Sequence, residues 1–446
     1  AAALIIYTDP KDSGYGKGEV YPDGPFYNET TIQRGSLLTL SYTGDPLTPF
    51  EPALPLDGDK KVKRLDPKDV AFHTIPVSPI GYGAAKEILS RMKGSSVPEE
   101  WQGGLPFEYR ITGGTELKVR VKVEQPIDYI RANNIVGKFE GSDYPDEWII
   151  LGSHYDAWSF GATDPNSGTA MILTLAEAIG EMVKNGERPK RSILIGHWDA
   201  EEQGVIGSTE WVEQFKDELD AKAVVYMNFD AAVSGRNFGV SAAPTLKNLI
   251  IEAAKEVEYP DSAKTVYEVW AGNNEEPRIG NLGGGSDHIA FYMYAGVPSL
   301  SGGTGGTSAY HSNYDNFHYY SNFVDPTFKM GGTLASVIGI LTLRMANATI
   351  IPYDVPRYAQ DLRLHFDNAV KSVKEIDSSF DYFGNWYKSL YVSTDPFSGY
   401  ASWILPGIKY EVETKSSDRL EEWDTRYAKA IQDLSKKVEN MTKSLK

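Results

Sequence analysis

The chain has 446 residues, of which 41% are hydrophobic and 12% aromatic, enough to build a buried core. Its 61 acidic and 44 basic residues give a formal net charge of −17. Nucleic acids and anionic membranes attract clustered Lys and Arg, so this balance argues against either as the main partner. The chain contains no cysteine, which excludes catalytic thiols, disulfides and thiolate metal sites. Any metal or catalytic site must therefore use His, Asp and Glu.

Residues 1–128 are rich in Gly, Pro and Tyr and contain short strand-like runs. Residues 38–42 and 117–123 have patterns typical of strands, and residues 83–92 predict an amphipathic helix. The first six residues lack a basic flank and are too short to span a membrane, so we expect a strand that lies inside a domain. We therefore predict a β-rich module over residues 1–128.

Strand and helix patterns alternate between residues 129 and 352. Strands are predicted at 149–151, 192–195 and 223–227, and helices at 170–183, 207–215 and 246–257. Such alternation indicates an α/β fold with a mixed, largely parallel sheet and helices on both faces. The longest apolar run, 334–343, is interrupted by Ser336 and Thr342 and predicts a buried helix. Residues 353–446 predict a helical module, with helices at 358–373 and 417–445.

Residue types that bind metals follow the predicted strands. His154 and Asp164 flank the loop after the first strand, Glu201 and Glu202 follow the second, and Asp230 follows the third. In open α/β sheets, ligands bind at the carboxyl edge of the strands. Imidazole and carboxylate together suit zinc, and a carboxylate can bridge two cations. Two later loops carry Ser286 and Asp287, and Tyr310 and His311.

Each of these residues also has an ordinary structural interpretation. An Asp after a strand is more often a helix cap or a turn residue than a ligand. Glu201 or Glu202 could counter a helix dipole, and Tyr310 could serve packing alone. The functional interpretation therefore depends on the joint arrangement of the residues.

That arrangement resembles the di-zinc exopeptidases of the glutamate carboxypeptidase II branch, which also includes transferrin receptor. Six catalytic positions match in order, and the stretches 21–24, 44–49 and 207–211 extend the resemblance through most of the chain. The resemblance implies a zinc exopeptidase fold with two Zn²⁺ per chain, a protease-associated-like module over 1–128, a catalytic domain over 129–352, and a shortened transferrin-receptor-like dimerisation module over 353–446.

The resemblance also assigns roles to individual residues. It implies that His154 and Asp230 bind the first zinc, that Glu202 and His311 bind the second, and that Asp164 bridges both. Glu201 matches the general base, Asp156 a carboxylate that orients a ligand, and Asp287 a supporting position. Two divalent ions about 3.5–4 Å apart lower the pKa of a shared water and polarise the scissile carbonyl. Glu201 then takes the proton and returns it to the leaving amine, and Tyr310 donates to the oxyanion.

A calcium ion is implied as well. The matching positions are Thr48 and Glu51 in one segment and Glu210 and Glu213 in another, and their hard oxygen atoms suit this ion. The spacing of Glu210 and Glu213 equally suits an exposed helix face.

Departures from the family pattern concern the substrate. The residues that receive an acidic side chain in glutamate-selective members correspond here to stretches without arginine, one of which contains Ser286. On the leaving side, the family's Lys-Tyr pair appears as Gly399-Tyr400, and its pocket asparagine as Ser36. Fewer cations and amides weaken the capture of carboxylates. We therefore expect a peptidase that does not require glutamate.

Three functions remain open at this point. A zinc exopeptidase of the carboxypeptidase type acting on small peptides is the leading hypothesis. A di-zinc aminopeptidase would share Glu201 and the metals, and an inactive receptor or scaffold would have lost the ligand set that this chain retains. The resemblance further implies a homodimer formed through 353–446, an extracytoplasmic location (secreted, cell-surface or vacuolar lumen), and a membrane anchor only upstream of this sequence. Asn28, Asn347 and Asn440 lie in glycosylation sequons.

Overall fold

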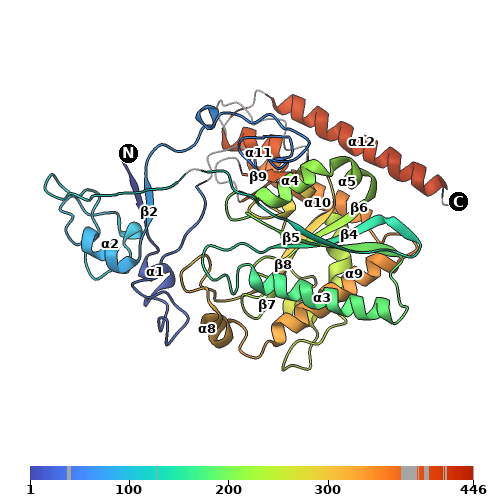
Figure 1. Cartoon of the computed structure of the whole chain (residues 1–446), viewed down its shortest axis with the longest axis horizontal. Helices are drawn as coiled ribbons and strands as arrows, with labels where there is room; N and C mark the ends of the chain where they lie inside the picture. The colour runs from blue at the N-terminus through green and yellow to red at the C-terminus, as the bar shows by residue number, and fades with distance from the viewer. Residues whose placement is uncertain are drawn as a thin grey trace.

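The computed structural model describes residues 1–37, 42–126, 128–372, 389, 391–395, 401–414, 416 and 419–444. Its largest sheet has six strands in the order β3-β5-β4-β6-β8-β7 (Figure 1). Four central strands run parallel to one another: β4 (Tyr144–His154), β5 (Arg191–Trp198), β6 (Ala223–Asn228) and β8 (Ser299–Gly305). The edge strands β3 (Ile135–Phe139) and β7 (Asn237–Ala242) are antiparallel to their neighbours. The predicted mixed, largely parallel sheet is confirmed.

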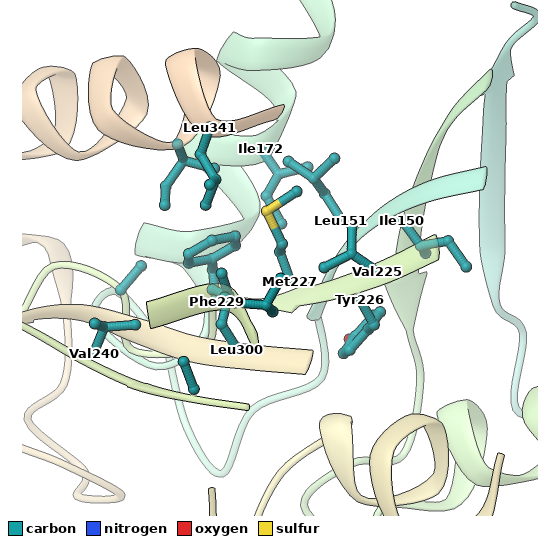
Figure 2. Close-up of a cluster of buried hydrophobic side chains, with 14 of the residues drawn as sticks. Ile150, Leu151, Ile172, Val225, Tyr226, Met227, Phe229, Val240, Leu300 and Leu341 are labelled. Carbon is teal, nitrogen blue, oxygen red and sulfur yellow. The ribbon is translucent and has the colours of Figure 1, made fainter. Parts of the chain in front are cut away.

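Helices cover both faces of this sheet. Helices α3 (Asn166–Lys184) and α9 (Lys329–Asn347) pack together on one face, and α4 (Ile206–Gln214) and α5 (Lys216–Lys222) lie on the other (Figure 1). Figure 2 shows Met227 directed toward Ile172 of α3 and Leu341 of α9, whereas Tyr226 points to the opposite side. There the Tyr226 ring stacks on Phe291 with centroids 3.8 Å apart. Because both faces are buried, β4, β5 and β6 each contain a continuous apolar run, whereas β8 is composed mainly of Ser and Gly.

The remaining elements of the middle domain are short. They are η3 (Pro244–Leu246), α6 (Lys247–Ala254), α7 (Val266–Ala271), the π-helices η4 (Ala290–Tyr294) and η5 (Tyr320–Val324), and α8 (Phe317–Tyr319). The predicted helices at 170–183, 207–215, 246–257 and 334–343 correspond to α3, α4, α6 and α9.

The N-terminal segment contains less strand than predicted. β1 (Leu4–Ile6) pairs in parallel with β2 (Val77–Pro79), and the helical elements are α1 (Pro10–Ser13), η1 (Pro67–Asp69), α2 (Tyr82–Leu89) and η2 (Glu99–Trp101). The strand predicted at 117–123 is wrong, because this segment has no strand partner and an unpaired strand leaves its backbone groups without hydrogen bonds. The prediction at 38–42 falls mainly on residues outside the described ranges.

The C-terminal segment is mainly helical, as predicted. It contains α10 (Val355–Ser372), α11 (Pro406–Glu413) and α12 (Leu420–Ser444), together with an unpredicted antiparallel pair, β9 (Val392–Thr394) and β10 (Ser402–Ile404). An ion pair of 2.6 Å between buried Lys247 and Asp361 connects α6 with α10. Among the described helices, none combines the length and hydrophobicity needed to cross a membrane.

Candidate metal centre

The predicted metal ligands and the predicted general base meet at the carboxyl edge of the parallel strands. His154 is the last residue of β4, Glu201 and Glu202 follow β5, and Asp230 follows β6. Asp164 lies just before α3. All five line one cavity of about 230 Å³ together with Tyr310 and His311. Parallel strands end at the same edge, which explains why segments far apart in sequence converge here.

Asp164 lies between the two imidazoles. Its Oδ1 is 3.2 Å from His154 Nε2, and its Oδ2 is 3.3 Å from His311 Nε2. Glu202 Oε2 is 3.1 Å from the same His311 nitrogen. Potential ligand atoms of Asp164, Glu202 and His311 all lie within 4.8 Å of one another. One carboxylate that directs an oxygen to each histidine has the arrangement expected of a bridging ligand.

The cluster fits divalent cations by an independent criterion. Glu202 Oε1 and Asp230 Oδ1 are buried and have no hydrogen-bond partner. Buried carboxylate oxygens without partners are costly, and cations placed among them would compensate that cost. The donor set of imidazole nitrogen and carboxylate oxygen, without thiolate, suits zinc sites that keep a position open.

Backbone carbonyl groups select the histidine tautomers. His154 Nδ1 lies 3.0 Å from the carbonyl oxygen of Asp156, and His311 Nδ1 lies 3.0 Å from that of Arg34. A carbonyl oxygen only accepts, so Nδ1 carries the proton in each neutral ring. Nε2 then directs its lone pair at the cavity, as a metal ligand requires. His311 also has a left-handed backbone with φ of 55°, which is uncommon for a residue other than glycine.

Asp156 holds the loop that carries Glu201 and Glu202. Its Oδ1 accepts the backbone N–H of Glu201 at 3.0 Å, and its Oδ2 accepts that of Glu202 at 3.1 Å. The same carboxylate lies 3.5 Å from His154 Nδ1. Asp156 thus contacts one potential ligand and the backbone of two residues in another loop.

A buried hydrogen-bond chain lies behind Asp230. Asp230 Oδ2 accepts from Ser286 Oγ and, at 3.1 Å, from Asn228 Nδ2. Asn228 in turn accepts from the Tyr226 hydroxyl, which accepts from Trp198 Nε1, both at 2.9 Å. Ser286, expected in a substrate pocket, is therefore buried and bonded to Asp230, while its neighbour Gly285 lines the cavity.

Asp287 is fully buried beside Ser286. Its Oδ1 accepts from the Ser208 hydroxyl at 2.5 Å, and its Oδ2 has no hydrogen-bond partner. Burial raises its pKa well above the ordinary value, and the negative charge of Asp230 adds to this effect.

Electrostatics keep protons in the metal-free cluster. Burial raises the pKa of Glu201 well above its ordinary value; Asp287, Asp230 and Glu202 add to this, and His154 opposes it. Burial lowers the pKa of His311, but hydrogen bonds to Asp164 and Glu202 outweigh it and raise that pKa to about 9. Burial raises the pKa of Asp164, but the two imidazoles outweigh it and lower that pKa to about 2. The pKa of the His311 imidazole and that of His154 are therefore raised in the absence of a bound cation.

Tyr310 lies at the entrance of the cavity. Its ring stacks on the His311 imidazole with centroids 3.7 Å apart and an angle of 16°, and the residue is 40% exposed. Its position beside a ligand and in contact with solvent is compatible with the predicted contact to substrate. Tyr400, the other expected substrate residue, lies outside the described residues.

The predicted calcium residues lie where the N-terminal segment meets α4. Glu210 of α4 accepts the backbone N–H groups of Asp45 and Ala53, each at 2.5 Å, so the loop that contains Thr48 and Glu51 closes over it. Burial raises the pKa of Glu210 to about 8. Thr48 Oγ1 is buried without a hydrogen-bond partner, Glu213 is buried, and Glu51 is exposed.

Three contributors to this site were not predicted. They are Asn228 behind Asp230, the Arg34 carbonyl group beside His311, and Asp315, whose carboxylate accepts the backbone N–H groups of Thr163 and Asp164. A polar residue at the end of the apolar run 223–227 is a signal that could have identified Asn228. Neither Arg34 nor Asp315 belongs to a motif that indicates its position in space.

The fold and the cluster place the chain in a class: α/β proteins with a carboxylate- and imidazole-lined candidate metal centre at the edge of a sheet. A protein-family profile described as Peptidase family M28 matches residues 134–326. Residues 134–326, which carry most of this centre, therefore belong to the M28 peptidase family, and the resemblance to the glutamate carboxypeptidase branch is confirmed.

Similar proteins bear two kinds of name. "Probable glutamate carboxypeptidase LAMP1" of Arabidopsis thaliana is 38% identical over 374 residues, which cover 81% of this chain and 52% of that protein. "Aminopeptidase NAALADL1" of Rattus norvegicus is 34% identical over 392 residues, with 81% and 52% covered. The chain thus spans about half the length of these relatives. A solved zinc aminopeptidase from Bacillus subtilis, BSAP, aligns over 50% of this chain and 52% of its own, with 18% identity and a TM-score of 0.38.

Proposed function

We propose that the chain is a di-zinc exopeptidase that hydrolyses small peptides. The observation that carries the proposal is the position of Asp164, with one oxygen 3.2 Å from His154 Nε2 and the other 3.3 Å from His311 Nε2. His154, Asp164 and Asp230 would hold one ion, and Asp164, Glu202 and His311 the other. Zinc bound there would act as a Lewis acid on a peptide carbonyl and would lower the pKa of water in the cavity.

Glu201 supplies the proton transfers in this proposal. It lines the cavity, and its Oε2 lies 3.9 Å from His154 Nε2. From this position its carboxylate would take a proton from water and return it to the leaving amine. Tyr310 faces the same cavity, and its hydroxyl would donate a hydrogen bond to the oxygen of the peptide carbonyl as negative charge develops there.

The neutral part of the cavity wall supports a substrate without an obligatory acidic residue. Among the described residues that line the cavity, none is Lys or Arg; the uncharged ones besides Tyr310 are Ala231, Gly285, Ser301 and Gly302. An acidic side chain would find no cation in this wall to form a bidentate pair. We therefore propose that the enzyme has no strict glutamate preference; the carboxypeptidase type is proposed from the resemblance to the relative named "Probable glutamate carboxypeptidase LAMP1".

An aminopeptidase is the second candidate. The cavity lining holds four carboxylates and no Lys or Arg among the described residues, a distribution that favours a substrate with a free N-terminal ammonium group. The relative named "Aminopeptidase NAALADL1" is compatible with this alternative.

Further parts of the proposal concern the assembly. They are a calcium ion held by Thr48, Glu51, Glu210 and Glu213, a homodimer formed through residues 353–446, glycosylation of the sequons, and an extracytoplasmic location. For the first of these, the backbone of Asp45 and Ala53 is bound to Glu210, so the segment that contains Thr48 and Glu51 lies against α4.

Glu201→Gln tests the catalytic assignment. The amide retains the shape of the side chain but cannot act as a base, so turnover is expected to fall by about 10²–10⁴-fold while two zinc ions per chain are retained. Metal content and peptide hydrolysis are measured on the same preparation. Glu181→Gln, on the exposed side of α3, is the matched control and should behave as wild type. Wild-type turnover by Glu201→Gln would refute the role, and a wild-type chain that binds no zinc would favour an inactive scaffold.

A substrate panel separates the two peptidase types. N-acetylated dipeptides should be cleaved by a carboxypeptidase and resisted by an aminopeptidase, which requires the free amine. Neutral dipeptides and N-acetyl-aspartyl-glutamate are compared at equal concentration by product release. A strong preference for the acidic compound would contradict the proposed lack of glutamate selectivity.

A further inference from the structure

Asp315 forms a second carboxylate clamp at the metal centre. The residue is 2% exposed, and its Oδ1 accepts the backbone N–H of Thr163 at 2.8 Å while its Oδ2 accepts that of Asp164 at 3.0 Å. Its own backbone carbonyl accepts the N–H of Ala162 at 3.1 Å. Three consecutive amides, which end at the bridging aspartate, are thus bound to one residue.

The clamp joins two loops that supply ligands. Asp315 lies four positions after His311, in a turn closed by hydrogen bonds from Ser312 N to the Ala309 carbonyl and from Asp315 N to the Ser312 carbonyl. The loop that carries His311 therefore holds the backbone of the loop that carries Asp164. About 150 positions separate the two segments, so no local preference of the chain could set their relative position.

A second aspartate carboxylate in the site also accepts two consecutive backbone N–H groups. Asp156, next to His154, accepts the consecutive N–H groups of Glu201 and Glu202 at 3.0 and 3.1 Å. In both cases the aspartate lies in a loop that carries a histidine ligand. Its two carboxylate oxygens accept two backbone N–H groups of a second loop, which carries acidic residues of the site. The two clamps together hold Asp164, Glu201 and Glu202 by their backbones.

Two parallel acceptors are needed for this contact. A carboxylate offers an oxygen to each of the two amides, whereas the side chain of Asn offers one oxygen and an NH₂ group that would face the second N–H donor. A buried N–H group left without an acceptor is destabilising, and movement of the loop would relieve this cost. Displacement of Asp164 by more than about 0.5 Å is enough to impair a metal site.

We propose that Asp315 is a positioning residue, which holds the backbone of Asp164 in place opposite His311 so that the two-metal site is preorganised before metal binds. This inference rests on the proposed zinc site. According to this inference, Asp315 controls zinc affinity although it is buried, lies outside the ligand set and does not contact substrate.

The test compares Asp315→Asn and Asp315→Ala with a matched control. Asp325 is a buried aspartate (3% exposed) whose Oδ2 accepts the backbone N–H of Gly331 at 3.1 Å at the start of α9, and it does not line the cavity. Zinc dissociation constants are measured by chelator competition on metal-free protein, together with the thermal midpoint of the metal-free chain. Asp315→Asn should weaken zinc binding by about 10- to 100-fold and Asp315→Ala further, while Asp325→Asn lowers the midpoint and leaves zinc affinity unchanged.

A second measurement needs no variant. In the metal-free wild-type chain, the amides of Thr163 and Asp164 should exchange hydrogen slowly, because the proposal requires the clamp to form before metal binds. The inference is overturned if these amides exchange as fast as exposed loop amides, or if Asp315→Asn binds zinc as tightly as wild type. A wild-type chain that binds no zinc would instead refute the proposed function and remove the basis of the clamp with it.

Discussion

Replacement of Gly168 by alanine should disturb the metal centre, because the added methyl group would displace the backbone that carries Asp230. Gly168 lies in the first turn of α3, and its N–H donates to the carbonyl oxygen of Asp230 at 3.2 Å. A Cβ atom there would lie 1.9 Å from the Phe229 carbonyl oxygen and 2.5 Å from that of Asp230. Contacts below 3.0 Å are essentially never observed, so α3 and the end of β6 must separate by about 1 Å, twice the roughly 0.5 Å that a functional site tolerates.

Two opposed contributions determine the expected change in the stability of Gly168→Ala. Overpacking of a tight contact destabilises by about 1–3 kcal/mol, and the better helix propensity of alanine returns up to about 1 kcal/mol. Because the moved backbone carries Asp230, we expect zinc bound by that residue to be lost more readily and turnover to fall with it. Chemical denaturation of the metal-free chain gives the stability, and chelator competition gives the zinc affinity.

Gly180→Ala is the matched control for this prediction. Gly180 belongs to the same helix, but its Cβ would meet only Phe139 Cε1 at an ordinary 3.8 Å. Alanine there should be neutral or should stabilise by up to about 1 kcal/mol, with unchanged zinc affinity. If Gly168→Ala retained the stability and zinc affinity of Gly180→Ala, the close approach of α3 to β6 would not define the position of Asp230.

Two further predictions concern pH and the core. In the absence of zinc, hydrogen bonds to Asp164 and Glu202 outweigh the effect of burial and raise the pKa of His311 from 6.5 to about 9, and the pKa of His154 is also raised. Zinc must therefore displace the proton of His311 at pH 7, and zinc affinity should rise by up to about tenfold per pH unit until pH passes about 9. Calorimetry in buffers of different ionisation enthalpy that detected no proton release would exclude this linkage. Because the pKa of His311 is higher in the folded chain than in the unfolded chain, protonated His311 stabilises the metal-free fold fully below pH 6.5. This contribution is lost as pH rises through about 9. Chemical denaturation at several pH values measures it. Ile172 is fully buried between α3 and the sheet, so Ile172→Ala should destabilise the fold by about 2–5 kcal/mol. Its neighbour Leu173 is 54% exposed, so Leu173→Ala should change stability by no more than about 0.5 kcal/mol. Equal effects at both positions would contradict the assigned core face.

The strands and helices of the middle domain could be predicted because their signals are local. The run 223–227 is apolar since β6 is covered on both faces, and α3 has the period of a helix with one face buried. Metal-binding residue types directly after such strands indicate a site at the sheet edge, as His154, Glu201 and Asp230 do. Residues 117–123 alternate equally well, yet form no strand, because alternation does not supply a partner.

Periodicity, composition and the position of polar residues along the chain were enough to predict the α/β class, the alternation of strands and helices between residues 149 and 257, and the residue types available for the metal centre. Only the tertiary structure decided how these residues support one another: Asp315 bound to the amides of the Asp164 loop, Ser286 turned toward Asp230, and the Arg34 carbonyl opposite His311. Each of these contacts joins residues separated by 56 to 277 positions in the sequence. Packing of the whole core, rather than local preference of the chain, brings such residues together.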